Sequence, residues 1–331
     1  MKKEDIFNAL VVSTTQTGVE RLVAKKRIID LPDNDIIINV KYSSLNYKDA
    51  LSANGHKGIT KLYPHTPGID SAGIVVASKS NKFQVGDKVI CMGYDLGMNT
   101  PGGYSEYISV PTNWVMPLPK TISLRDAMVI GTAGFTAAIG VNEIINSGIN
   151  REDGKILVTG ATGGVGIMAV IMLSKLGYDV TASSGKKEQY QLLEKAGAKT
   201  IIGREAVDDK SERGLLKYQW IGAFDTVGGN ILSTVLKSMK YGGVVVNCGN
   251  VASIMLNVTV FPFILRGVRL IGIAAAETPM NKRMEIWEKL ENELRLPNIE
   301  YLVKEITLNE LSSEIDIMLA GKQFGRVIVK L

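Results

Sequence analysis

The apolar residues in the first third of the chain occur in short runs separated by Gly, Pro, Asn and Asp. Runs of this length, in which polar positions alternate with apolar ones, are typical of β-strands. Several such strands at close spacing predict a barrel or another compact antiparallel fold. The runs are DIIINVKYSSLN (35–46), AGIVVAS (72–78), GDKVICMG (86–93) and GYSEYISVP (103–111).

After residue 124 the apolar residues follow a helical spacing, first in LRDAMVIGTAGFTAAIGVNEII (124–145). From residue 155 onward, short apolar runs alternate with amphipathic stretches. This alternation predicts a parallel sheet with helices on both faces. The predicted strands are KILVTG (155–160), YDVTAS (178–183), KTIIG (199–203), WIGAFDTVGG (220–229), VVVNCGN (244–250) and VRLIGIA (268–274), and the helices are GVGIMAVIMLSKLG (164–177), KKEQYQLLEKAGA (186–198) and NILSTVLKSMKYGG (230–243).

The chain is long enough for two domains of ordinary size. A helical stretch covers residues 279–294, and the segment 304–331 predicts one helix and a final strand. That strand falls outside the alternating block, so we expect it to return to the first domain. The expected domains are residues 1–124 with 297–331, and residues 125–296.

The composition is that of an ordinary globular protein, since 45% of the 331 residues are apolar and 21% are charged. The net charge of +5 is small and dispersed, so it does not indicate nucleic-acid binding. A mildly basic protein is compatible with an anionic small molecule such as a phosphorylated cofactor.

No apolar stretch of the sequence approaches the roughly 18 residues that span a bilayer. The N-terminal segment is a poor signal peptide, because Glu4 and Asp5 follow the basic residues and Asn8 interrupts the apolar run. The two cysteines, Cys91 and Cys248, form no CxxC motif, which excludes a disulfide framework and a cysteine-built zinc lobe. We therefore expect a cytoplasmic protein with no membrane partner.

The stretch ILVTGATGGVG (156–166) places a glycine-rich turn between a predicted strand and a predicted helix. Free amides and the positive end of the helix dipole suit a pyrophosphate at such a place. Gly163 lets the phosphate approach the backbone, and Gly166 lets the helix pack on the strand. The expected cofactor-binding residues of the turn are Thr162, Gly163, Gly164, Val165 and Gly166.

The sequence disfavours three other interpretations of this turn. A tight turn without a ligand is disfavoured, because strand, turn and helix all fall where the dinucleotide motif needs them. The nucleoside-triphosphate pattern is excluded because no Gly-Lys-Ser/Thr follows. The TGxxxGxG pattern of short-chain dehydrogenases fits the turn, but none of the 11 tyrosines has a lysine four residues later, and the motif begins only at residue 159.

The end of the second strand of the block indicates which cofactor is bound. An NAD site places Asp or Glu there, about 20 residues after the first glycine position. The stretch TASSGKKEQ (181–189) has no acid before Glu188, and it offers hydroxyl and ammonium groups that suit a 2′-phosphate. We therefore predict NADPH over NAD, although the lysines could also be a solvated helix start. The residues assigned to this role are Ser183, Ser184, Gly185, Lys186, Lys187 and Arg204.

The plan of a β-rich domain, a dinucleotide domain and a short return segment resembles the medium-chain dehydrogenase/reductase superfamily along the whole chain. Zinc members of that superfamily carry a C-x-x-D stretch and a downstream Gly-His-Glu. This chain has Asn46-Tyr47-Lys48-Asp49 and Gly68-Ile69-Asp70 instead. Neither position keeps its cysteine or histidine, so the resemblance points to the zinc-free branch and no metal is expected.

Several stretches resemble a narrower group, the acryloyl-CoA reductases, whose members are often labelled quinone oxidoreductases. The resemblance implies an α/β protein with an N-terminal GroES-like β-barrel catalytic domain and a doubly wound parallel-sheet (Rossmann) domain. It also implies a cytoplasmic homodimer, with the edge strand VRLIGIA as a candidate contact. The stretches are SSLNYKDAL, PGIDSAG, GTAGFTAA, VTGATGGVG, DTVGG, PFILRGVRL and GRVIVKL.

The same resemblance implies hydride transfer from NADPH to the β-carbon of a conjugated carbonyl compound. Without zinc, fixed hydrogen-bond donors must stabilise the developing enolate, and a proton must reach the α-carbon. Asn46 and Tyr47 are the candidate donors, through an amide and a phenol. For Tyr47, packing on the nicotinamide or substrate is an equal alternative. Asp49 is a candidate catalytic residue, although holding the loop by accepting backbone amides is the favoured role.

Further residues are candidates from their positions. Thr132 borders the nicotinamide by resemblance, although its residue type also suits a helix N-cap. Gly249 and Asn250 follow a strand of the predicted parallel sheet, where such sheets bind ligands. Lys322 and Arg326 could meet phosphates, with solvent-facing side chains as the default interpretation.

Three residues near these candidates were assigned other roles. Asp225 is expected to accept hydrogen bonds mainly in a structural role, and Cys248 to be buried rather than reactive. His65 is expected to be a loop residue near the cleft, with contact to substrate as a minor alternative.

Three functions remain open at this point. The first is an NADPH-dependent reductase of acryloyl-CoA or a short enoyl-CoA. The second is a quinone or general enone reductase. The third is an NADPH-binding protein with a structural or regulatory role and no turnover, because binding alone does not establish catalysis.

Overall fold

The computed structural model describes residues 2–16 and 18–331, which form two compact units. The first unit contains the chain up to Thr132 together with Ala276–Glu291 and Asn298–Leu331. The second contains Ala133–Ala275 and Asn292–Pro297. The division expected from the sequence, at 124/125 and 296/297, differs mainly at helix α7 (Met280–Glu291), which belongs to the first unit. The buried Arg283 explains the difference, because its guanidinium donates to the Met92 carbonyl of that unit at 3.1 Å.

The first unit is built on a seven-stranded sheet in the order β14-β15-β3-β4-β5-β7, with β6 paired to β3. The four apolar runs of the first third each contain one of its strands. The final strand pairs antiparallel with β3 and so returns to the first unit, as predicted. The strands are β3 (Ile36–Ser44), β4 (Asp70–Ser78), β5 (Lys88–Met92), β6 (Tyr107–Val110), β7 (Val115–Pro117), β14 (Val303–Thr307) and β15 (Arg326–Lys330), and the short helices of the unit are α1 (Tyr47–Ala53) and α8 (Leu311–Leu319).

An antiparallel hairpin of β1 (Ile6–Thr15) and β2 (Gly18–Arg27) precedes this sheet and was not predicted. In β2 the apolar positions are few and charged residues are interspersed, so the strand lacks an apolar run. Backbone bonds attach β1 to the rest of the unit, from Leu10 N to Tyr104 O at 2.8 Å and from Val12 N to His65 O at 2.7 Å. Strand β14 was missed for the same reason as β2, because charged residues interrupt it.

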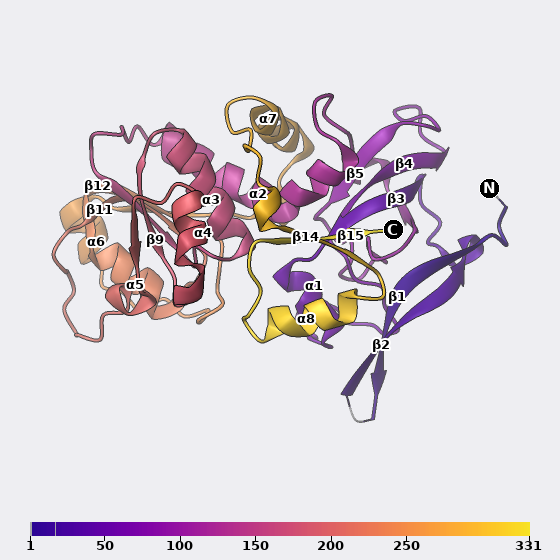
Figure 1. The fold of residues 1–331 in the computed structure, drawn as a ribbon, viewed down its shortest axis with the longest axis horizontal. Coiled ribbons are helices and arrows are strands. Elements are labelled where there is room, and N and C mark those ends of the chain that lie inside the picture. Colours follow the sequence, from indigo (N-terminus) through magenta and orange to yellow (C-terminus); the bar gives the residue numbers. More distant parts are fainter. Residues whose placement is uncertain (1, 17) are drawn as a thin grey trace. The chain divides into compact units, whose positions relative to one another are not determined.

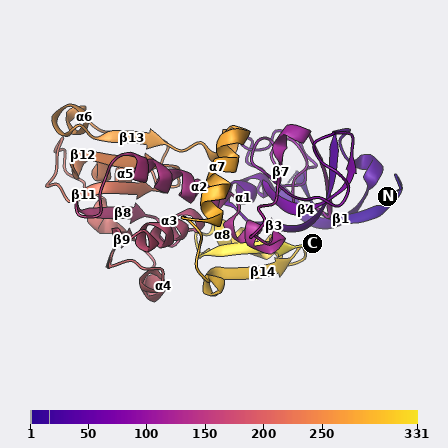
Figure 2. The same ribbon diagram turned by 90° about the horizontal axis from the view of Figure 1, so that it is seen from above.

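The second unit is a six-stranded parallel sheet in the order β10-β9-β8-β11-β12-β13. This is the strand order of the dinucleotide-binding fold. Helices flank the sheet on either side in Figure 1, and Figure 2 shows β13 at one edge. The elements are β8 (Lys155–Thr159), α3 (Gly164–Lys175), β9 (Asp179–Ser183), α4 (Tyr190–Lys195), β10 (Thr200–Ile202), β11 (Trp220–Asp225), α5 (Gly229–Lys237), β12 (Met239–Asn247), α6 (Phe261–Arg266) and β13 (Arg269–Gly272).

The predicted strands of this block are confirmed, while two helix bounds differ. The helix predicted for residues 230–243 ends at Lys237, and residues 239–243 form the first part of β12. Helix α4 begins at Tyr190, whereas the sequence predicted a helix from Lys186. Residues 187–189 form a separate short turn of helix. Lys186 and Lys187 therefore lie in the connection after β9, at the end of the sheet that binds dinucleotides.

Helix α2 (Leu124–Asn146) is kinked at Gly131, where φ is 49° and ψ is −161°. By length and composition alone the helix could cross a bilayer, which differs from our expectation that no stretch would. However, 72% of its most apolar window is buried inside the protein. Burial of this kind is typical of a core helix, in which apolar residues occur on all sides.

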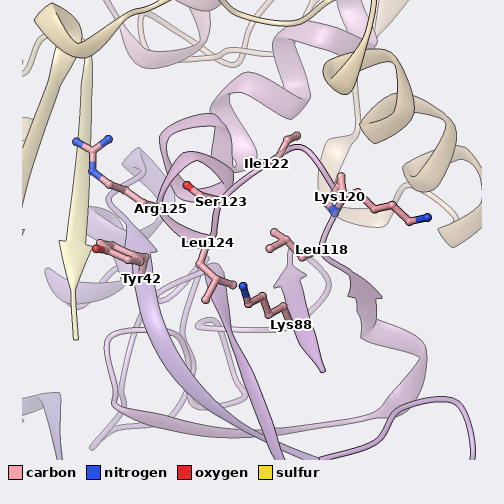
Figure 3. A pocket seen from close by; sticks show the side chains of 9 residues that line it. Tyr42, Lys88, Leu118, Lys120, Ile122, Ser123, Leu124 and Arg125 are labelled. Atoms are coloured by element: carbon pink, nitrogen blue, oxygen red, sulfur yellow. The ribbon is translucent and has the colours of Figure 1, made fainter. Parts of the chain in front are cut away.

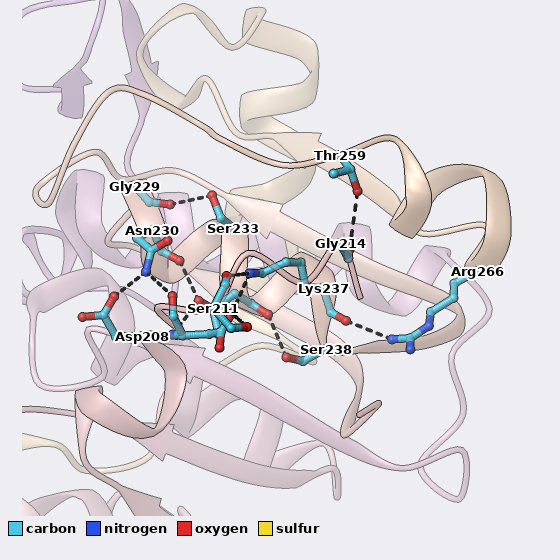
Figure 4. A network of polar contacts seen from close by, with 12 residues as sticks. Asp208, Ser211, Gly214, Gly229, Asn230, Ser233, Lys237, Ser238, Thr259 and Arg266 are labelled. Atoms are coloured by element: carbon cyan, nitrogen blue, oxygen red, sulfur yellow. Dashed lines mark hydrogen bonds and ion pairs between the residues drawn. The ribbon is translucent and has the colours of Figure 1, made fainter. Parts of the chain in front are cut away.

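A polar network fastens the long connection between β10 and β11 to helix α5 (Figure 4). The Lys237 ammonium lies 2.6 Å from an Asp209 carboxylate oxygen, and the Asn230 amide donates to Asp208 at 2.6 Å. Arg266, at the end of α6, donates to the carbonyls of Lys237, Met239 and Leu216. These contacts satisfy backbone acceptors that a long surface connection would otherwise leave unpaired.

Candidate functional site

The glycine turn lies between β8 and α3 in the second unit, as predicted. Gly160 has a φ of +57°, a backbone conformation that favours glycine. A Cβ on Gly166 would lie 2.4 Å from the Gly160 carbonyl oxygen, so only glycine lets α3 pack this closely. Gly163 is exposed and precedes the first helical residue, Gly164. The backbone amides of the turn and of the first helical residues, from Thr162 to Gly166, are therefore arranged as in a phosphate-binding helix start.

The end of β9 is hydrogen-bonded to this turn. The Ala161 amide donates to the Ser183 carbonyl at 3.1 Å, and the hydroxyls of Thr162 and Ser184 lie 3.2 Å apart. The Ser184 hydroxyl also accepts from the Lys186 amide at 3.1 Å. The structure thus brings the glycine turn and the serine-lysine segment together.

The cationic side chains predicted for the 2′-phosphate also come from neighbouring strand ends. A Cβ on Gly185 would lie 3.1 Å from Cδ of Arg204, so the Arg204 side chain runs alongside the segment after β9. Lys187 is exposed, and partial burial lowers the pKa of Lys186, with Glu188 opposing that shift. Two lysine ammonium groups and one exposed guanidinium beside glycine amides fit a phosphorylated adenosine ribose.

Asp225, the last residue of β11, lies at the same carboxyl end of the parallel sheet. Its carboxylate accepts from the Thr159 hydroxyl at 2.6 Å, the Asn247 amide at 2.7 Å and the Gly228 backbone amide at 2.8 Å. Burial raises the pKa of Asp225, while these hydrogen bonds oppose the shift. Its contacts are structural, which is the role that the sequence favoured.

Gly249 and Asn250 follow β12 at this carboxyl end of the sheet. The Gly249 carbonyl accepts from the Asn247 amide at 3.0 Å, and Asn250 is exposed. A Cβ on Gly249 would lie 1.9 Å from the Thr226 carbonyl oxygen, so this position requires glycine. Just before Gly249, burial raises the pKa of Cys248 to about 12, so its thiol stays protonated at neutral pH.

The first unit contains a buried polar cluster centred on Asp70, the first residue of β4. Its carboxylate accepts from the Ser44 hydroxyl at 2.6 Å and from the Asn46 amide at 2.9 Å. It also accepts from the Thr132 hydroxyl at 2.6 Å and the Thr132 backbone amide at 2.8 Å. Asp70 therefore caps the helical segment that resumes after the Gly131 kink.

Asp49 is the second buried carboxyl group of this cluster. It accepts from the backbone amides of Asn46 at 2.9 Å and Ile69 at 2.8 Å, which is the loop-holding role that the sequence favoured. Burial, together with the nearby charge of Asp70, raises the pKa of Asp49 to about 7. The group therefore titrates near neutral pH without contacting solvent.

Arg326 supplies the positive charge of the cluster, so the expectation that it faces solvent or phosphates was wrong. Its side chain is only 2% exposed, and its Nε donates to the Val129 carbonyl at 2.9 Å. One guanidinium nitrogen lies 3.4 Å from Oδ1 of the Asn46 side-chain amide. Burial lowers the pKa of Arg326, while Asp70, Tyr104 and Asp49 oppose that shift. A buried cation with two nearby carboxyl groups is compensated by charge and by hydrogen bonds.

These contacts change the roles open to the two predicted donors. The Asn46 amide nitrogen donates to Asp70 and lies 3.2 Å from Asp49, so its hydrogens are engaged inside the cluster. Asn46 is thus placed to orient the start of α1 rather than to donate to a substrate. Tyr47, the first residue of α1, is 42% exposed. Its phenol is the accessible group of the pair.

Sequence reasoning missed several members of this cluster, including Ser44 and Tyr104. Tyr104 is fully buried, its hydroxyl donates to the Ser44 carbonyl at 3.2 Å, and burial raises its pKa well above the usual range. No local signal marks these residues, because the contacts join strands far apart in the chain. Arg326 did carry a signal, since it is a charge at the start of the otherwise apolar stretch RVIV.

His65 lies apart from any candidate chemistry. Its backbone amide and carbonyl both bond to Val12 of β1, and its side chain is 6% exposed. Burial lowers the pKa of His65, which favours the neutral imidazole. His65 lies in the connection between α1 and β4, as expected for a loop residue.

Two surface hollows were found within the units, and neither is lined by a predicted site residue. One of about 410 Å³ lies at the connection into α2, where the side chains of Lys88 and Leu124 point toward one another (Figure 3). The other, of about 780 Å³, is lined by residues that include Tyr218, Lys240 and Arg266. Among residues 2–16 and 18–331, no three His, Cys, Asp or Glu side chains are grouped to hold a metal ion.

Known proteins are similar to this chain over nearly its whole length. A family model described as the alcohol dehydrogenase GroES-like domain matches residues 32–120, and one described as zinc-binding dehydrogenase matches residues 164–292. The chain is 44% identical over 327 residues to YhfP of Bacillus subtilis (strain 168), provisionally named a quinone oxidoreductase, with 98% of this chain and 99% of YhfP covered. It is 39% identical over 326 residues to the acrylyl-CoA reductase AcuI of Ruegeria pomeroyi, with 98% and 99% covered.

Solved structures agree with these matches. The crystal structure of YhfP with NAD bound has a TM-score of 0.96 and 43% identity, covering 99% of this chain and 100% of that one. The yhdH oxidoreductase of Salmonella enterica in complex with NADP has a TM-score of 0.94 and 40% identity, covering 98% and 99%. The expected GroES-like and Rossmann fold is confirmed. The chain therefore belongs to the medium-chain dehydrogenase/reductase family of oxidoreductases, in the group that contains YhfP and AcuI.

Proposed function

We propose that this protein is an NADPH-dependent reductase of the C=C bond of a conjugated carbonyl compound, with acryloyl-CoA or another short enoyl-CoA as substrate. The observation that carries the proposal is the glycine turn joined to a lysine-bearing strand end in the second unit. The relation to AcuI supports the choice of an enoyl-CoA.

The cofactor is assigned from the residues at the end of β9. The backbone amides of Thr162–Gly166 would hold the pyrophosphate, and Ser183, Ser184, Gly185, Lys186, Lys187 and Arg204 would surround the 2′-phosphate. No acid stands at the end of β9 to bind the ribose hydroxyls, as an NAD site would require. We assign Thr132, Gly249, Asn250 and Tyr47 to the nicotinamide half of the cofactor. The Thr132 hydroxyl also donates a hydrogen bond to Asp70.

NADPH supplies the hydride that the β-carbon of the substrate accepts. The π electrons of the C=C bond then move toward the carbonyl, and negative charge develops on its oxygen. We assign the Tyr47 phenol to this oxygen as a hydrogen-bond donor, because charge at that point is best stabilised by a fixed donor. The α-carbon finally takes up a proton, from Tyr47 or from water.

The first unit keeps that donor in place. Asn46 joins the start of α1 to Asp70, and Asp49 joins the same turn to Ile69. Because both carboxyl groups are buried and hydrogen-bonded, we assign Asn46 and Asp49 to positioning Tyr47. A phenol fixed in this way loses little entropy when it binds the developing oxyanion.

The proposal is tested by NADPH oxidation with acryloyl-CoA, a simple enone and a quinone. We expect the largest kcat/KM with acryloyl-CoA. A far larger kcat/KM with the quinone would favour the second candidate, quinone reduction, which the name of YhfP suggests. Tight NADPH binding without oxidation across all three substrates would favour a binding protein without turnover.

We further infer a homodimer formed through the second unit. Residues 249–265 contain no charged side chain, yet Ile254 is 83% and Ile264 is 68% exposed. An uncharged apolar surface can face a copy of itself without like-charge repulsion. Strand β13 is also an edge strand of the sheet.

Light scattering tests this contact. We expect the unaltered protein to be a dimer and the Ile254→Lys variant to be a monomer. A variant that remains a dimer would contradict this contact.

Apart from a second copy of the chain, we propose that the protein binds only its small-molecule substrate and cofactor, and neither nucleic acid nor a membrane. We place the enzyme in the cytoplasm, where free thiols persist, because Cys91 and Cys248 are both unpaired and stay as thiols.

A further inference from the structure

A basic loop follows helix α1, the helix that begins with Tyr47. Residues 48–62 carry three lysines, Lys48, Lys57 and Lys61, and one acidic residue, Asp49. Asp49 is fully buried and bonded to backbone amides, so it does not neutralise the surface. Lys57 and Lys61 are exposed. The exposed face of this segment is therefore positively charged.

The described parts of the chain provide no ion-pair partner for these lysines. The Lys61 backbone amide donates to the side-chain oxygen of Asn99 at 3.3 Å, and Asn99 connects this loop to Asp95. The Asp95 carboxylate itself accepts from Asn99 at 2.9 Å and from the Thr100 hydroxyl at 3.0 Å. The ammonium groups of Lys57 and Lys61 thus remain available to an anionic ligand.

The loop is held firmly against α1. The His56 amide donates to the Leu51 carbonyl at 3.0 Å, and the hydroxyls of Ser52 and Thr60 lie 2.6 Å apart. The Tyr63 hydroxyl donates to the Ser52 carbonyl at 2.6 Å. A loop fixed in advance loses little conformational entropy on binding, which favours its use as a docking site.

The loop and Tyr47 lie at opposite ends of α1, whose seven residues span about 10 Å. A CoA thioester carries its reactive acyl group at one end and its phosphate groups at the far end of a flexible arm. A quinone carries no phosphate. Cations set at a distance from the candidate donor therefore match the layout of a CoA thioester.

We propose that Lys57 and Lys61, on the loop after α1, dock the phosphate groups of CoA while Tyr47 faces the acyl end. This inference rests on the proposed function, because it assumes that Tyr47 faces the carbonyl. It assigns a place to the phosphates and separates the enoyl-CoA substrate from a quinone by charge. Phosphate contacts of this kind are strong and depend on salt.

Calorimetric titration with free CoA tests the docking site directly. Saturating NADP⁺ is present, so that the glycine turn cannot bind the CoA nucleotide. We expect the Lys57→Ala/Lys61→Ala variant to bind CoA at least tenfold more weakly than the unaltered protein. The matched control is Lys82→Ala/Lys120→Ala, which removes two exposed lysines of the same unit and should bind CoA normally. Pantetheine, which lacks the phosphates, should bind both variants equally.

Kinetics separate this inference from the proposed function. The double variant should raise the KM for acryloyl-CoA at least tenfold, with kcat and the KM for acryloyl-pantetheine within twofold. Unchanged CoA affinity in Lys57→Ala/Lys61→Ala, or an equal loss in the control, would overturn the docking site. Lysine-dependent CoA binding without reduction of any enoyl thioester would refute the proposed function and leave the docking site standing.

Discussion

Asp49 and Asp70 are both fully buried carboxyl groups, but their surroundings differ. Asp70 accepts four hydrogen bonds, from Ser44, Asn46 and Thr132. For Asp49, burial outweighs its hydrogen bonds, and its pKa rises to about 7. The buried guanidinium of Arg326 belongs to the same cluster. The accessible phenol of Tyr47 begins the helix that this cluster holds.

Replacing the Tyr47 phenol tests its assignment as a donor. Tyr47→Phe keeps the ring and removes only the hydroxyl, so a packing role would be preserved. If the hydroxyl donates to the enolate oxygen, kcat should fall at least tenfold, which corresponds to about 1.4 kcal/mol of lost transition-state stabilisation. Steady-state kinetics with acryloyl-CoA give the result, and full activity would leave packing as the only role.

The raised pKa of Asp49 makes a prediction about stability and pH. The folded protein keeps a proton on Asp49 up to about pH 7, whereas the unfolded chain releases it near the ordinary aspartate pKa of 3.8. Stability from this group is therefore complete below that lower value and is lost as pH rises toward 7. The melting temperature should fall between pH 5 and pH 8, and it should fall less in Asp49→Asn. Equal slopes in the two proteins would contradict the raised pKa.

At the scale of elements, helix α2 depends on one glycine. Gly131 has a positive φ, and a Cβ there would lie 2.7 Å from both a guanidinium nitrogen of Arg326 and a carboxylate oxygen of Asp70. The kink therefore serves two needs, since it turns the backbone and makes room for the buried charges. After it, Asp70 caps the resumed helix at Thr132.

Two glycine substitutions separate these needs. Gly131→Ala adds both backbone strain and contacts with buried charges, and we expect it to destabilise by about 3 kcal/mol or more. Gly148→Ala also has a positive φ, +85°, but nothing lies within 4 Å of the added Cβ. It should cost only about 1 kcal/mol. Thermal melting compares the two, and equal losses would mean that the buried cluster tolerates the added atom.

The end of β9 carries the prediction for the cofactor. Lys186→Ala/Lys187→Ala removes two cations assigned to the 2′-phosphate, so the KM for NADPH should rise about tenfold or more. The KM for NADH, which lacks that phosphate, should stay nearly unchanged. An unaltered KM for NADPH would refute the assignment, and a parallel rise for NADH would indicate damage to the turn itself.

The elements that the sequence predicted well are those with an uninterrupted apolar run. Strands β8, β9, β11 and β12 are buried in the parallel sheet, and their continuous apolar runs predict such strands. The hairpin partner β2 and strand β14 were missed because charged residues interrupt them. Their pairing is decided by neighbours distant in the sequence, which no local pattern contains.

The candidate site divides in the same way. The glycine turn is local, so its residues could be found from spacing alone. The cluster of Asp49, Asp70 and Arg326 joins segments more than 250 residues apart in sequence, and the engagement of the Asn46 amide follows only from that packing. Sequence reasoning gave Asn46 a donor role, but its amide nitrogen already donates to Asp70 and lies close to Asp49. The role of Tyr47 stays a prediction.

At the scale of the whole molecule, the two units have separate tasks in our account. The second unit binds NADPH through main-chain amides and a cationic strand end. The first unit orients a phenol and, by our inference, docks the phosphates of a CoA thioester. We expect neither task to need a metal ion, since Asn46 and Ile69 stand at the positions where zinc members carry cysteine and histidine.

The most direct test of the central claim follows the hydride itself. Acryloyl-CoA is reduced with NADPH carrying deuterium at C4, using each of the two stereospecifically labelled forms, and the propionyl-CoA is analysed by NMR. We predict that one form places deuterium on the β-carbon of the product, and that unlabelled NADPH in D₂O places deuterium on the α-carbon. Absence of propionyl-CoA, or a product whose β-carbon carries no deuterium with either form, would contradict direct hydride transfer to a conjugated thioester.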